Sequence, residues 1–369
     1  MAAALAVSFP AVYACTWSYP IWAIRSQTAD PLFRFMRNKK AGYIDATGKI
    51  VLQPVIAPLG NFGGEFHEGL LALRDGRYVD SSGTTRIRWS GGSAGGFSEG
   101  LAPVGRGEYP AQWGFMDPSG RLVIPAQYFR VDDFSDGLAG VSVSGDVGSR
   151  GYVDHEGNFV IPPTLTYGFS FHEGLVAAIV EGPCRMTNIG SCGPAAFEPV
   201  GKRAQYECRY SFIDRTGKPI SELRFDYAQD FSEGLAAVRM GIGKQWGFVD
   251  KTGKLAIQPQ FTYAHSFSEG LAAVTNEYGK VGFIDRSGNF VIEPQSFSAE
   301  GFSNGRALIT EGGFLETPSF RYIDKTGKPA FPGTFQRATS FRHGLAHVTW
   351  SVGHAWIDTS GRPVFKYSE

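Results

Sequence analysis

FSEGLAAVRMGIGKQWGFVDKTGKLAIQP, residues 231–259, is the stretch that decides the fold, because both of its halves recur along the chain. The second half holds an aromatic-aliphatic pair followed by Asp, two residues and Gly, and this pattern occurs nine times, at Asp45, Asp80, Asp117, Asp154, Asp214, Asp250, Asp285, Asp324 and Asp358. Seven of the eight gaps between these Asp residues are 34 to 39 residues long, and the eighth is 60. A fixed period in this range predicts a repeat architecture.

The first half, FSEGL followed by small and apolar residues, recurs between the turn patterns. Eight such blocks begin at Phe66, Phe97, Phe134, Phe171, Phe231, Phe267, Phe302 and Phe341. Each block is followed by a turn pattern, and the repeats open and close on a turn pattern. A group that recurs in every copy is expected to serve the fold, so function must be sought where the copies differ.

Each repeat predicts three or four short strands. Leu235–Arg239 and Trp246–Val249 are short apolar runs between turn residues, and Leu255–Ile257 follows as a return strand. We expect Gln258-Pro259 to end that strand, because Pro cannot donate to a ladder, and a fourth extended piece over Phe261–Ala264. Helical periodicity is absent, and 48 Gly and 21 Pro fit a chain rich in turns. The predicted fold is therefore all-β, a repeat array of short hairpin units.

The Asp patterns are interpreted as structural turns. Asp suits the first position because its carboxylate accepts nearby backbone N–H groups. The Gly three residues later can adopt positive φ and close a bulged hairpin. This assigns structural turn roles to Asp45, Gly48, Asp117, Gly120, Asp154, Gly157, Asp214, Gly217, Asp250, Gly253, Asp285, Gly288, Asp324, Gly327, Asp358 and Gly361.

Two closures suit such units. One is a β-propeller with one blade per repeat around an axis, which the repeat length favours. The other is an open β-solenoid of stacked hairpins. The first, partial unit could complete the last blade by strand exchange, or it could form a frayed cap.

The blocks resemble the WG-repeat, or KWG-repeat, family of bacterial repeat proteins. FSEGLAAV and GKQWGFVDKTGKLAIQP match the family pattern almost throughout, and residues 267–294 match nearly as well. The resemblance covers about 42 to 365, apart from an insertion at 181–209. Its Trp-Gly dipeptide is kept at Trp113 and Trp246, whereas other copies carry Ala41, Arg150 or Val281, and Trp356 sits two places later. The resemblance implies a repeat scaffold, often exported, that brings no catalytic residues.

Composition excludes some classes of partner. The 369 residues hold 35 Lys plus Arg and 35 Asp plus Glu. A neutral chain lacks the basic footprint of a nucleic-acid binder, and no basic run suggests a membrane surface. No phosphate-loop or dinucleotide fingerprint is present, so no cofactor is expected. The oligomeric state cannot be inferred from the sequence.

The first 28 residues are interpreted as an apolar leader before a repeat domain over 29–369. Residues 2–15 resemble the apolar core of a secretory signal, although Arg25 is the first basic residue. Cys15 ends a sequence that loosely resembles a lipoprotein box, so membrane attachment through a lipidated Cys15 is one possibility. We expect an exported protein of the periplasm or cell envelope; the alternative is a cytoplasmic protein.

The insertion at 181–209 holds the other three cysteines. Their spacing matches no zinc template. In an exported protein, Cys184 and Cys192 could form a disulfide, and Cys208 could replace either of them.

Several catalytic and metal constellations are rejected. One acid per turn, often beside Lys or Arg, does not supply the six oxygens that calcium needs. The Glu of the FSEGL blocks (Glu68, Glu99, Glu173, Glu233, Glu269) recurs too regularly for an acid-base pair. Gly91–Gly95 fits a G-x-S-x-G pattern but leads into a repeat block instead of a helix, so it is interpreted as a linker. His343 and His347 are interpreted as surface residues.

The sequence favours a non-catalytic scaffold that binds a protein or a glycan at the bacterial cell envelope. Candidate contacts are the segments that break the pattern: residues 181–209, Arg106 to Gln112, and Phe314 to Phe320. The alternative is a glycan-active hydrolase or lyase on a propeller, which would need acids converging at one end of the fold.

Overall fold

The protein is an all-β ring in the computed structural model. The structure describes residues 31–56, 64–107, 110–146, 148–181, 184–186, 197–199, 209–241, 243, 245–312, 317–351 and 353–368. Every regular element within these ranges is a β-strand. The described residues contain no helix that is long and apolar enough to cross a bilayer.

The strands group into ten antiparallel sheets, nine of which follow one another in chain order. The first four are β1 (Phe33–Arg37), β2 (Lys40–Ile44) and β3 (Ile50–Ile56); β4 (Leu71–Ala72), β5 (Arg77–Val79) and β6 (Thr85–Arg88); β7 (Ala102–Arg106), β8 (Gln112–Met116) and β9 (Leu122–Tyr128); and β10 (Arg130–Val131), β11 (Ala139–Ser142), β12 (Arg150–Val153) and β13 (Phe159–Leu165).

The fifth sheet contains β14 (Tyr167–Gly168), β15 (Val176–Glu181) and β18 (Arg209–Ile213), and between the last two lies the separate hairpin of β16 (Cys184–Met186) and β17 (Phe197–Pro199). The remaining sheets are β19 (Tyr227–Ala228), β20 (Leu235–Met240), β21 (Gln245–Asp250) and β22 (Leu255–Phe261); β23 (Tyr263–Ala264), β24 (Ala272–Thr275), β25 (Val281–Ile284) and β26 (Phe290–Ser296); β27 (Ser298–Ala299), β28 (Ala307–Glu311) and β29 (Ser319–Ile323); and β30 (Arg337–Ala338), β31 (Leu345–Trp350), β32 (Gly353–Asp358) and β33 (Pro363–Tyr367).

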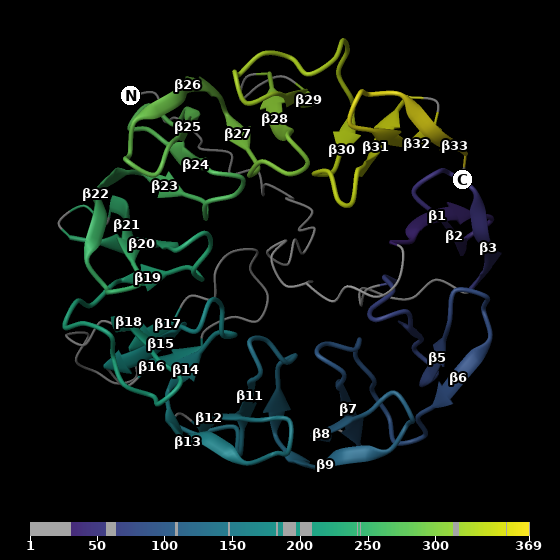
Figure 1. The fold of residues 1–369 in the computed structure, drawn as a ribbon, viewed down its shortest axis with the longest axis vertical. Helices are drawn as coiled ribbons and strands as arrows, with labels where there is room; N and C mark the ends of the chain where they lie inside the picture. The colour runs from purple at the N-terminus through teal and green to yellow at the C-terminus, as the bar shows by residue number, and fades with distance from the viewer. Residues whose placement is uncertain are drawn as a thin grey trace, which may run out of the picture.

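The nine sheets stand around a central axis as the blades of a propeller (Figure 1). The short first strand of a blade, such as β19 or β23, lies nearest the centre, and the last strand, such as β22 or β26, lies at the rim. Each blade is too small to bury both of its faces alone, so its core is completed by its neighbours. One such core joins Phe248 and Ile257 of one blade to Phe267 and Val274 of the next.

The ring closes where the first blade packs on the last. The rings of Phe33 and Trp356 lie 5.0 Å apart, and Trp356 Nε1 donates to the carbonyl of Arg34 at 2.9 Å. Phe35 packs on Phe365, with ring centroids 4.9 Å apart. The propeller expectation is therefore confirmed. The first turn pattern does not complete the last blade by strand exchange, because both blades have strands of their own.

One aromatic contact recurs at eight of the nine interfaces between blades. The ring after the Trp-Gly position packs on the repeat Phe of the next blade, with centroids 4.6 to 5.4 Å apart. These eight pairs are Tyr43–Phe66, Tyr78–Phe97, Phe115–Phe134, Tyr152–Phe171, Phe212–Phe231, Phe248–Phe267, Phe283–Phe302 and Tyr322–Phe341. At the seam, Trp356 stands at the position of Phe248 in its repeat, two places after the motif Trp position, and packs on Phe33 of β1, which aligns with Ala236 and not with a repeat Phe.

The Gly of the Trp-Gly dipeptide lets the rim strand pack closely against the strand that carries this Gly. A Cβ at Gly247 would lie 2.5 Å from the carbonyl oxygen of Ile257, and the same crowding occurs at Gly42, Gly114, Gly151 and Gly282. Ser211 and Arg321 occupy this position in two blades, and there the rim strand is reduced to isolated bridges. Arg77 and Ala355 also occupy this position, and there the rim strand pairs directly with them, opposite Arg88 and Lys366. The glycine therefore goes with the irregular register of the rim strand opposite it, as at Gly247 and Gly282.

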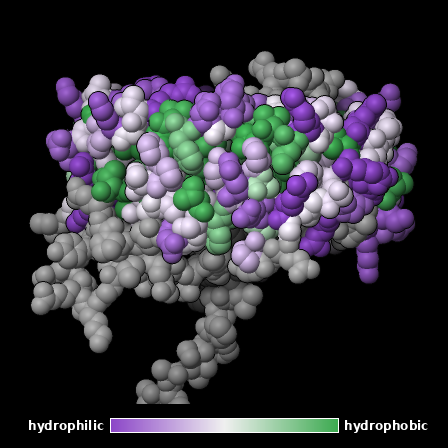
Figure 2. All heavy atoms as spheres, turned by 90° about the horizontal axis from the view of Figure 1, so that it is seen from below, coloured by the Kyte–Doolittle hydropathy of each residue, from purple (hydrophilic) through white to green (hydrophobic). Residues whose placement is uncertain are grey.

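The rim strand is longer than expected. β22 continues through Pro259 to Phe261, so the prediction that Gln258-Pro259 ends it was wrong. Pro is tolerated because a rim edge needs no donor. The fourth piece expected over Phe261–Ala264 is split, because Tyr263 and Ala264 form the first strand of the next blade. Seen from the side, the rim carries isolated apolar side chains among hydrophilic ones (Figure 2).

The nine Asp patterns share one turn geometry. In each, Asp Oδ1 accepts from the backbone N–H groups two and four residues later, as Asp250 does from Thr252 and Lys254 at 2.8 and 3.1 Å. The Gly that closes each turn has φ between 77 and 86°. The carboxylate therefore satisfies backbone donors within its own turn.

The G-x-S-x-G segment is an ordered part of a blade. Gly95 N donates to the carbonyl of Pro103, and Gly105 N donates to that of Ser93, each at 2.8 Å. Residues 91–95 thus run along β7 in the place of a first strand. The linker interpretation was wrong, because these backbone groups find partners in β7.

We predict that Gly253→Ala destabilises the protein more than Gly241→Ala. Both glycines have positive φ, at 77 and 86°. A Cβ at Gly253 would meet Ser221 at 2.5 Å, whereas nothing lies within 4 Å of one at Gly241. The backbone strain of about 1 kcal/mol is common to both, so the difference measures the clash. Thermal unfolding of the two variants should give the lower Tm for Gly253→Ala; equal melting temperatures would contradict the turn packing.

Candidate functional site

The ring has two faces of different character. Within a blade, Leu235 pairs with Asp250 at one end of the second and third strands, and Met240 pairs with Gln245 at the other. The Asp turns and the FSEGL turns therefore lie together on one face, which we call the turn face. The connections between second and third strands lie on the opposite face, which we call the loop face.

On the turn face, a ladder of hydrogen bonds joins consecutive blades. The acidic or amide side chain of one FSEGL turn accepts from the Gly N–H of the next turn at 2.7 to 3.1 Å. The seven links are Glu68–Gly100, Glu99–Gly137, Asp136–Gly174, Glu173–Gly234, Glu233–Gly270, Glu269–Gly305 and Asn304–Gly344. The Glu of the repeat is thus committed to the scaffold.

The backbone places these side chains by an unusual turn. Ser98 and Leu101 exchange two backbone hydrogen bonds, and Glu99 and Gly100 between them have φ of 52 and 83°. Two consecutive positive φ values define a type I′ turn, which suits the twist of a hairpin. A left-handed non-Gly residue costs about 1 kcal/mol, and the inter-blade hydrogen bond offsets this cost.

Basic side chains of the Asp turns reinforce the ladder. Lys251 Nζ lies 2.9 Å from Glu173 Oε2, and Lys325 Nζ lies 3.3 Å from Glu269 Oε2. Partial burial alone would raise the pKa of Glu173, but the hydrogen bond and charge of Lys251 outweigh it and lower that pKa. Polar groups on the turn face therefore satisfy one another.

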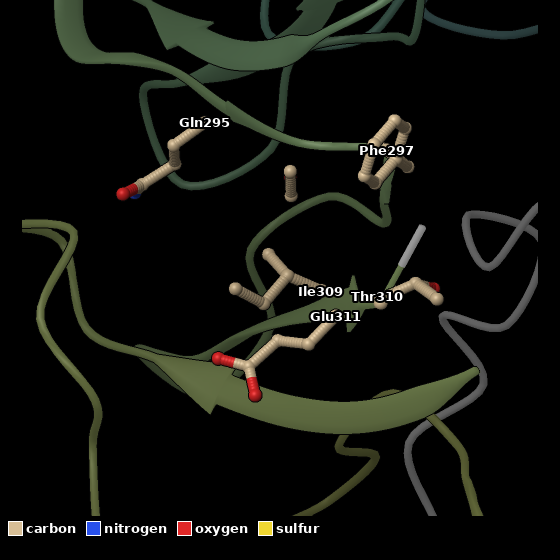
Figure 3. A pocket seen from close by; sticks show the side chains of 7 residues that line it. Gln295, Phe297, Ile309, Thr310 and Glu311 are labelled. Carbon is tan, nitrogen blue, oxygen red and sulfur yellow. The ribbon is translucent and has the colours of Figure 1, made fainter. Parts of the chain in front are cut away.

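A small cleft opens on the loop face between β26 and β28 (Figure 3). It has a volume of about 210 Å³ and is lined by Gln295, Ser296, Phe297, Ile309, Thr310, Glu311 and Gly312. Phe297 is half exposed, and Lys280 Nζ lies 3.2 Å from the centre of its ring. Glu311 is held by Arg321 at 2.7 Å. The cleft presents an aromatic ring beside amide, hydroxyl and carboxylate groups.

A larger cleft of about 470 Å³ opens on the last blade. It is lined by Trp350, Gly353, His354, Pro363, Lys366, Tyr367 and Ser368. Trp350 pairs with Gly353, and His354 with Tyr367, at the ends of β31, β32 and β33 away from the Asp turn. This second cleft therefore also belongs to the loop face.

An aromatic band extends over the fifth to seventh blades near the loop face. Tyr227 packs on Tyr210 at 5.6 Å and on Trp246 at 5.7 Å, and Trp246 packs on Tyr263 at 5.2 Å. Tyr263 remains 37% exposed, whereas Trp246 is buried. Trp246, the Trp of the repeat motif, is thus part of the packed interior, and Tyr263 is the exposed end of this band.

Arg150 replaces the repeat Trp in the fourth blade, and two of its neighbours, Asp132 and Gly140, also depart from the repeat. It is buried, pairs with Asp132, and lies 5.6 and 5.5 Å from the ring centres of Tyr152 and Tyr167. Gly140 stands where other repeats carry Ala, and a Cβ there would overlap the guanidinium. Asp132, Gly140 and Arg150 are therefore three mutually fitting departures from the repeat.

The strand ends that flank the three pattern-breaking segments all lie on the loop face. β7 and β8 flank residues 107–111, β15 and β18 flank the insertion, and β28 and β29 flank residues 312–318. Within the insertion only 184–186 and 197–199 are described, so Cys192 and Cys208 lie outside the described residues, as do the leader and Cys15. Of Cys184 only the backbone is described, and the disulfide stays a prediction.

The metal and histidine hypotheses can be compared with the geometry. No cluster of three or more His, Cys, Asp or Glu suited to a metal ion occurs in the ranges that the structure covers. His343 sits at positive φ in the last FSEGL turn. His347 is half-buried and lies 2.9 Å from the Tyr367 hydroxyl, so its assignment to the surface was wrong. Sequence reasoning missed Phe297 in one cleft and Trp350, His354 and Tyr367 in the other, because neighbouring strand ends form each cleft only after folding.

The fold and its repeated contacts define a propeller-type repeat protein. A family model described as WG containing repeat matches residues 113–145, 151–182, 210–244, 246–279, 282–313 and 320–349. The chain therefore belongs to the WG-repeat family. None of the curated proteins compared with it matches.

Solved structures are similar to this chain, and one of them has a TM-score above 0.5. A crystal structure of a eukaryotic initiation factor matches with a TM-score of 0.59 and 12% identity, over 92% of this chain and 96% of that one. BamB from Moraxella catarrhalis matches with a TM-score of 0.41 and 14% identity, over 81% of this chain and 90% of its own. At such identities the likeness concerns the fold alone.

We predict that Glu173→Gln destabilises the protein by about 1 kcal/mol at pH 7, the range expected for a half-exposed charged contact. Because the pKa of Glu173 is lowered on folding, its charge stabilises the fold above the ordinary Glu pKa. That contribution is lost as the pH falls through the lowered value. Urea unfolding at pH 7 and below pH 4 should show the difference from wild type shrinking in acid. The exposed Glu222→Gln is the control; a pH-independent deficit for Glu173→Gln would contradict the charged link.

We predict that Gly140→Ala, which restores the residue found in other repeats, destabilises this protein. Overpacking against Arg150 should cost on the order of 1–3 kcal/mol. The same change should be tolerated in an Asp132→His/Arg150→Val background, which copies the residues of the seventh blade (His265, Ala273, Val281). A double-mutant cycle from unfolding free energies measures the coupling. Equal costs in the two backgrounds would refute the fit of the three departures.

Proposed function

We propose that this protein is a non-catalytic binding scaffold that holds a protein or glycan ligand on its loop face at the bacterial cell envelope. One observation carries the proposal. The groups that recur in the repeats are paired with one another on the turn face, whereas both clefts and the strand ends that flank the three pattern-breaking segments lie on the loop face. A site must differ from the repeats around it, and the differences gather on this face.

The scaffold suits such a role because it is rigid where the loops begin. The loops leave from strands that are paired on both sides, such as β20 and β21. Binding residues are commonly found on loops held by a rigid framework. The half-exposed Phe297 and Tyr263 add aromatic surface on the same side of the ring.

The carboxyl groups of Asp132 and Asp230, which stand just before two FSEGL blocks, favour binding over catalysis. Burial raises the pKa of Asp230 to about 6, and the His172 imidazole, 3.5 Å away, partly opposes this rise. A glycosidase pairs such an acid with a second carboxylate at a set distance. Asp230 is engaged instead with His172, and Asp132 with Arg150. A hydrolase or lyase activity is the alternative, and loss of glycan cleavage in Asp230→Asn would support it.

Location at the envelope is part of the proposal. It rests on the apolar residues 2–15 and on Cys15. Fractionation of cells that carry the wild type or Cys15→Ser tests it. An envelope protein should be found outside the cytosolic fraction. Non-reducing mass mapping of that protein should show a disulfide between Cys184 and Cys192. A full-length cytosolic protein with free thiols would overturn the assignment.

The binding face is tested by paired variants of the full chain. We predict that Phe297→Ala/Trp350→Ala on the loop face weakens capture of ligands from envelope extract and on a glycan array at least fivefold. Arg286→Ala/Lys325→Ala on the turn face should leave capture unchanged. Circular dichroism confirms that each variant is folded. Loss of capture only in the turn-face variant would overturn the proposal.

A further inference from the structure

The larger loop-face cleft has walls that are fixed in advance. His354 stacks on Tyr367 with centroids 5.2 Å apart and planes 17° apart, and His347 stacks on His354 at 5.5 Å and 17°. Tyr367 is also packed against Phe35 and Phe365, both at 5.8 Å. Rings held this way form a rigid aromatic surface, which lowers the ordering cost of binding.

The polar atoms around this surface are oriented as well. The Tyr367 hydroxyl lies 2.9 Å from His347 Nε2, and Thr349 Oγ1 lies 3.3 Å from His354 Nδ1. Burial, with the charges of His354 and Arg34, lowers the pKa of His347 to about 4, so this imidazole is neutral at pH 7. The His347 imidazole therefore adds no net charge to the aromatic wall.

The cleft has a charged side chain, Lys366, at its edge. Lys366 is exposed and leaves β33 on the face opposite to Phe365 and Tyr367, and at the end of the strand it lines the cleft together with Tyr367 and Ser368. An exposed ammonium beside a flat aromatic wall selects a ligand with an apolar face and a negative group. The volume of about 470 Å³ falls within the range of small-ligand sites.

We propose that this cleft binds an acidic oligosaccharide, with a sugar ring stacked on the His354–Tyr367 surface and its carboxylate paired with Lys366. A sugar ring offers C–H groups on one face and hydroxyls at its edge, which matches an aromatic wall with Ser368 and Lys366 at the rim. The inference deepens the proposed function by naming the ligand class of one loop-face site.

A peptide is the competing occupant. β33 is the rim strand of its sheet, and an extended peptide could add to such an edge. Pro363 lies within β33 and removes one backbone donor from that edge. The aromatic wall is contributed by side chains instead of by the strand backbone, which favours the sugar.

The test uses an array of uronate- and sialate-containing oligosaccharides beside neutral ones, followed by calorimetric titration of the full chain. The best acidic oligosaccharide and its methyl ester form a matched pair that differs in charge. We expect the acid to bind at least fivefold more tightly than the ester. Lys366→Gln should abolish that preference, His354→Ala should weaken both ligands, and the exposed turn-face variant Lys218→Gln should change neither.

The outcomes separate this site from the broader proposal. Acidic sugars that fail to bind, or bind equally to wild type, Lys366→Gln and His354→Ala, overturn the cleft assignment. If the loop-face variants still lose capture of another ligand, the scaffold function stands without this site. Binding of an extended peptide that is lost in His354→Ala, with no sugar binding, would assign the cleft to peptides and refute the inference.

Discussion

The aromatic contact between consecutive blades is the interaction on which the rest of the structure depends. A three- or four-stranded blade cannot bury its own apolar faces, so each blade lends a ring to the next, as Phe248 does to Phe267. Such a pair contributes about 0.5–1.5 kcal/mol beyond the area it buries. Eight such contacts and a different aromatic pair at the seam, Phe33–Trp356, leave no blade of the ring without a neighbour.

This constraint divides the ring between structure and variation. The contact fixes the FSEGL turns beside one another, which places Glu173 within reach of both Gly234 and Lys251. The carboxylates of this ladder on the turn face are therefore bound to groups of the neighbouring blades. Among the residues that the structure describes, the opposite ends of the strands carry no such ladder, so sequence changes there leave the contacts between blades intact.

The repeated features could be predicted from the sequence, because period, turn chemistry and strand pattern are local. The all-β class, the propeller and the family follow from them. The seam could not be predicted, because Trp356 reaches Phe33 and Arg34 from the far end of the chain. Pro259 was misjudged because the sequence does not say which strand lies at the rim. The clefts were missed because the ends of β31, β32 and β33 meet only after folding.

Ring closure is tested most directly by the distance between spin labels on the equivalent exposed residues Lys49 and Arg362, in the first and last blades, with the four native Cys replaced. In the closed ring these blades are neighbours, so the labels should lie within roughly 30 Å, given sheet packing at about 10 Å and two label arms. An open array of nine sheets would separate them by roughly 80 Å. A distance distribution centred near the longer value would contradict the closed propeller.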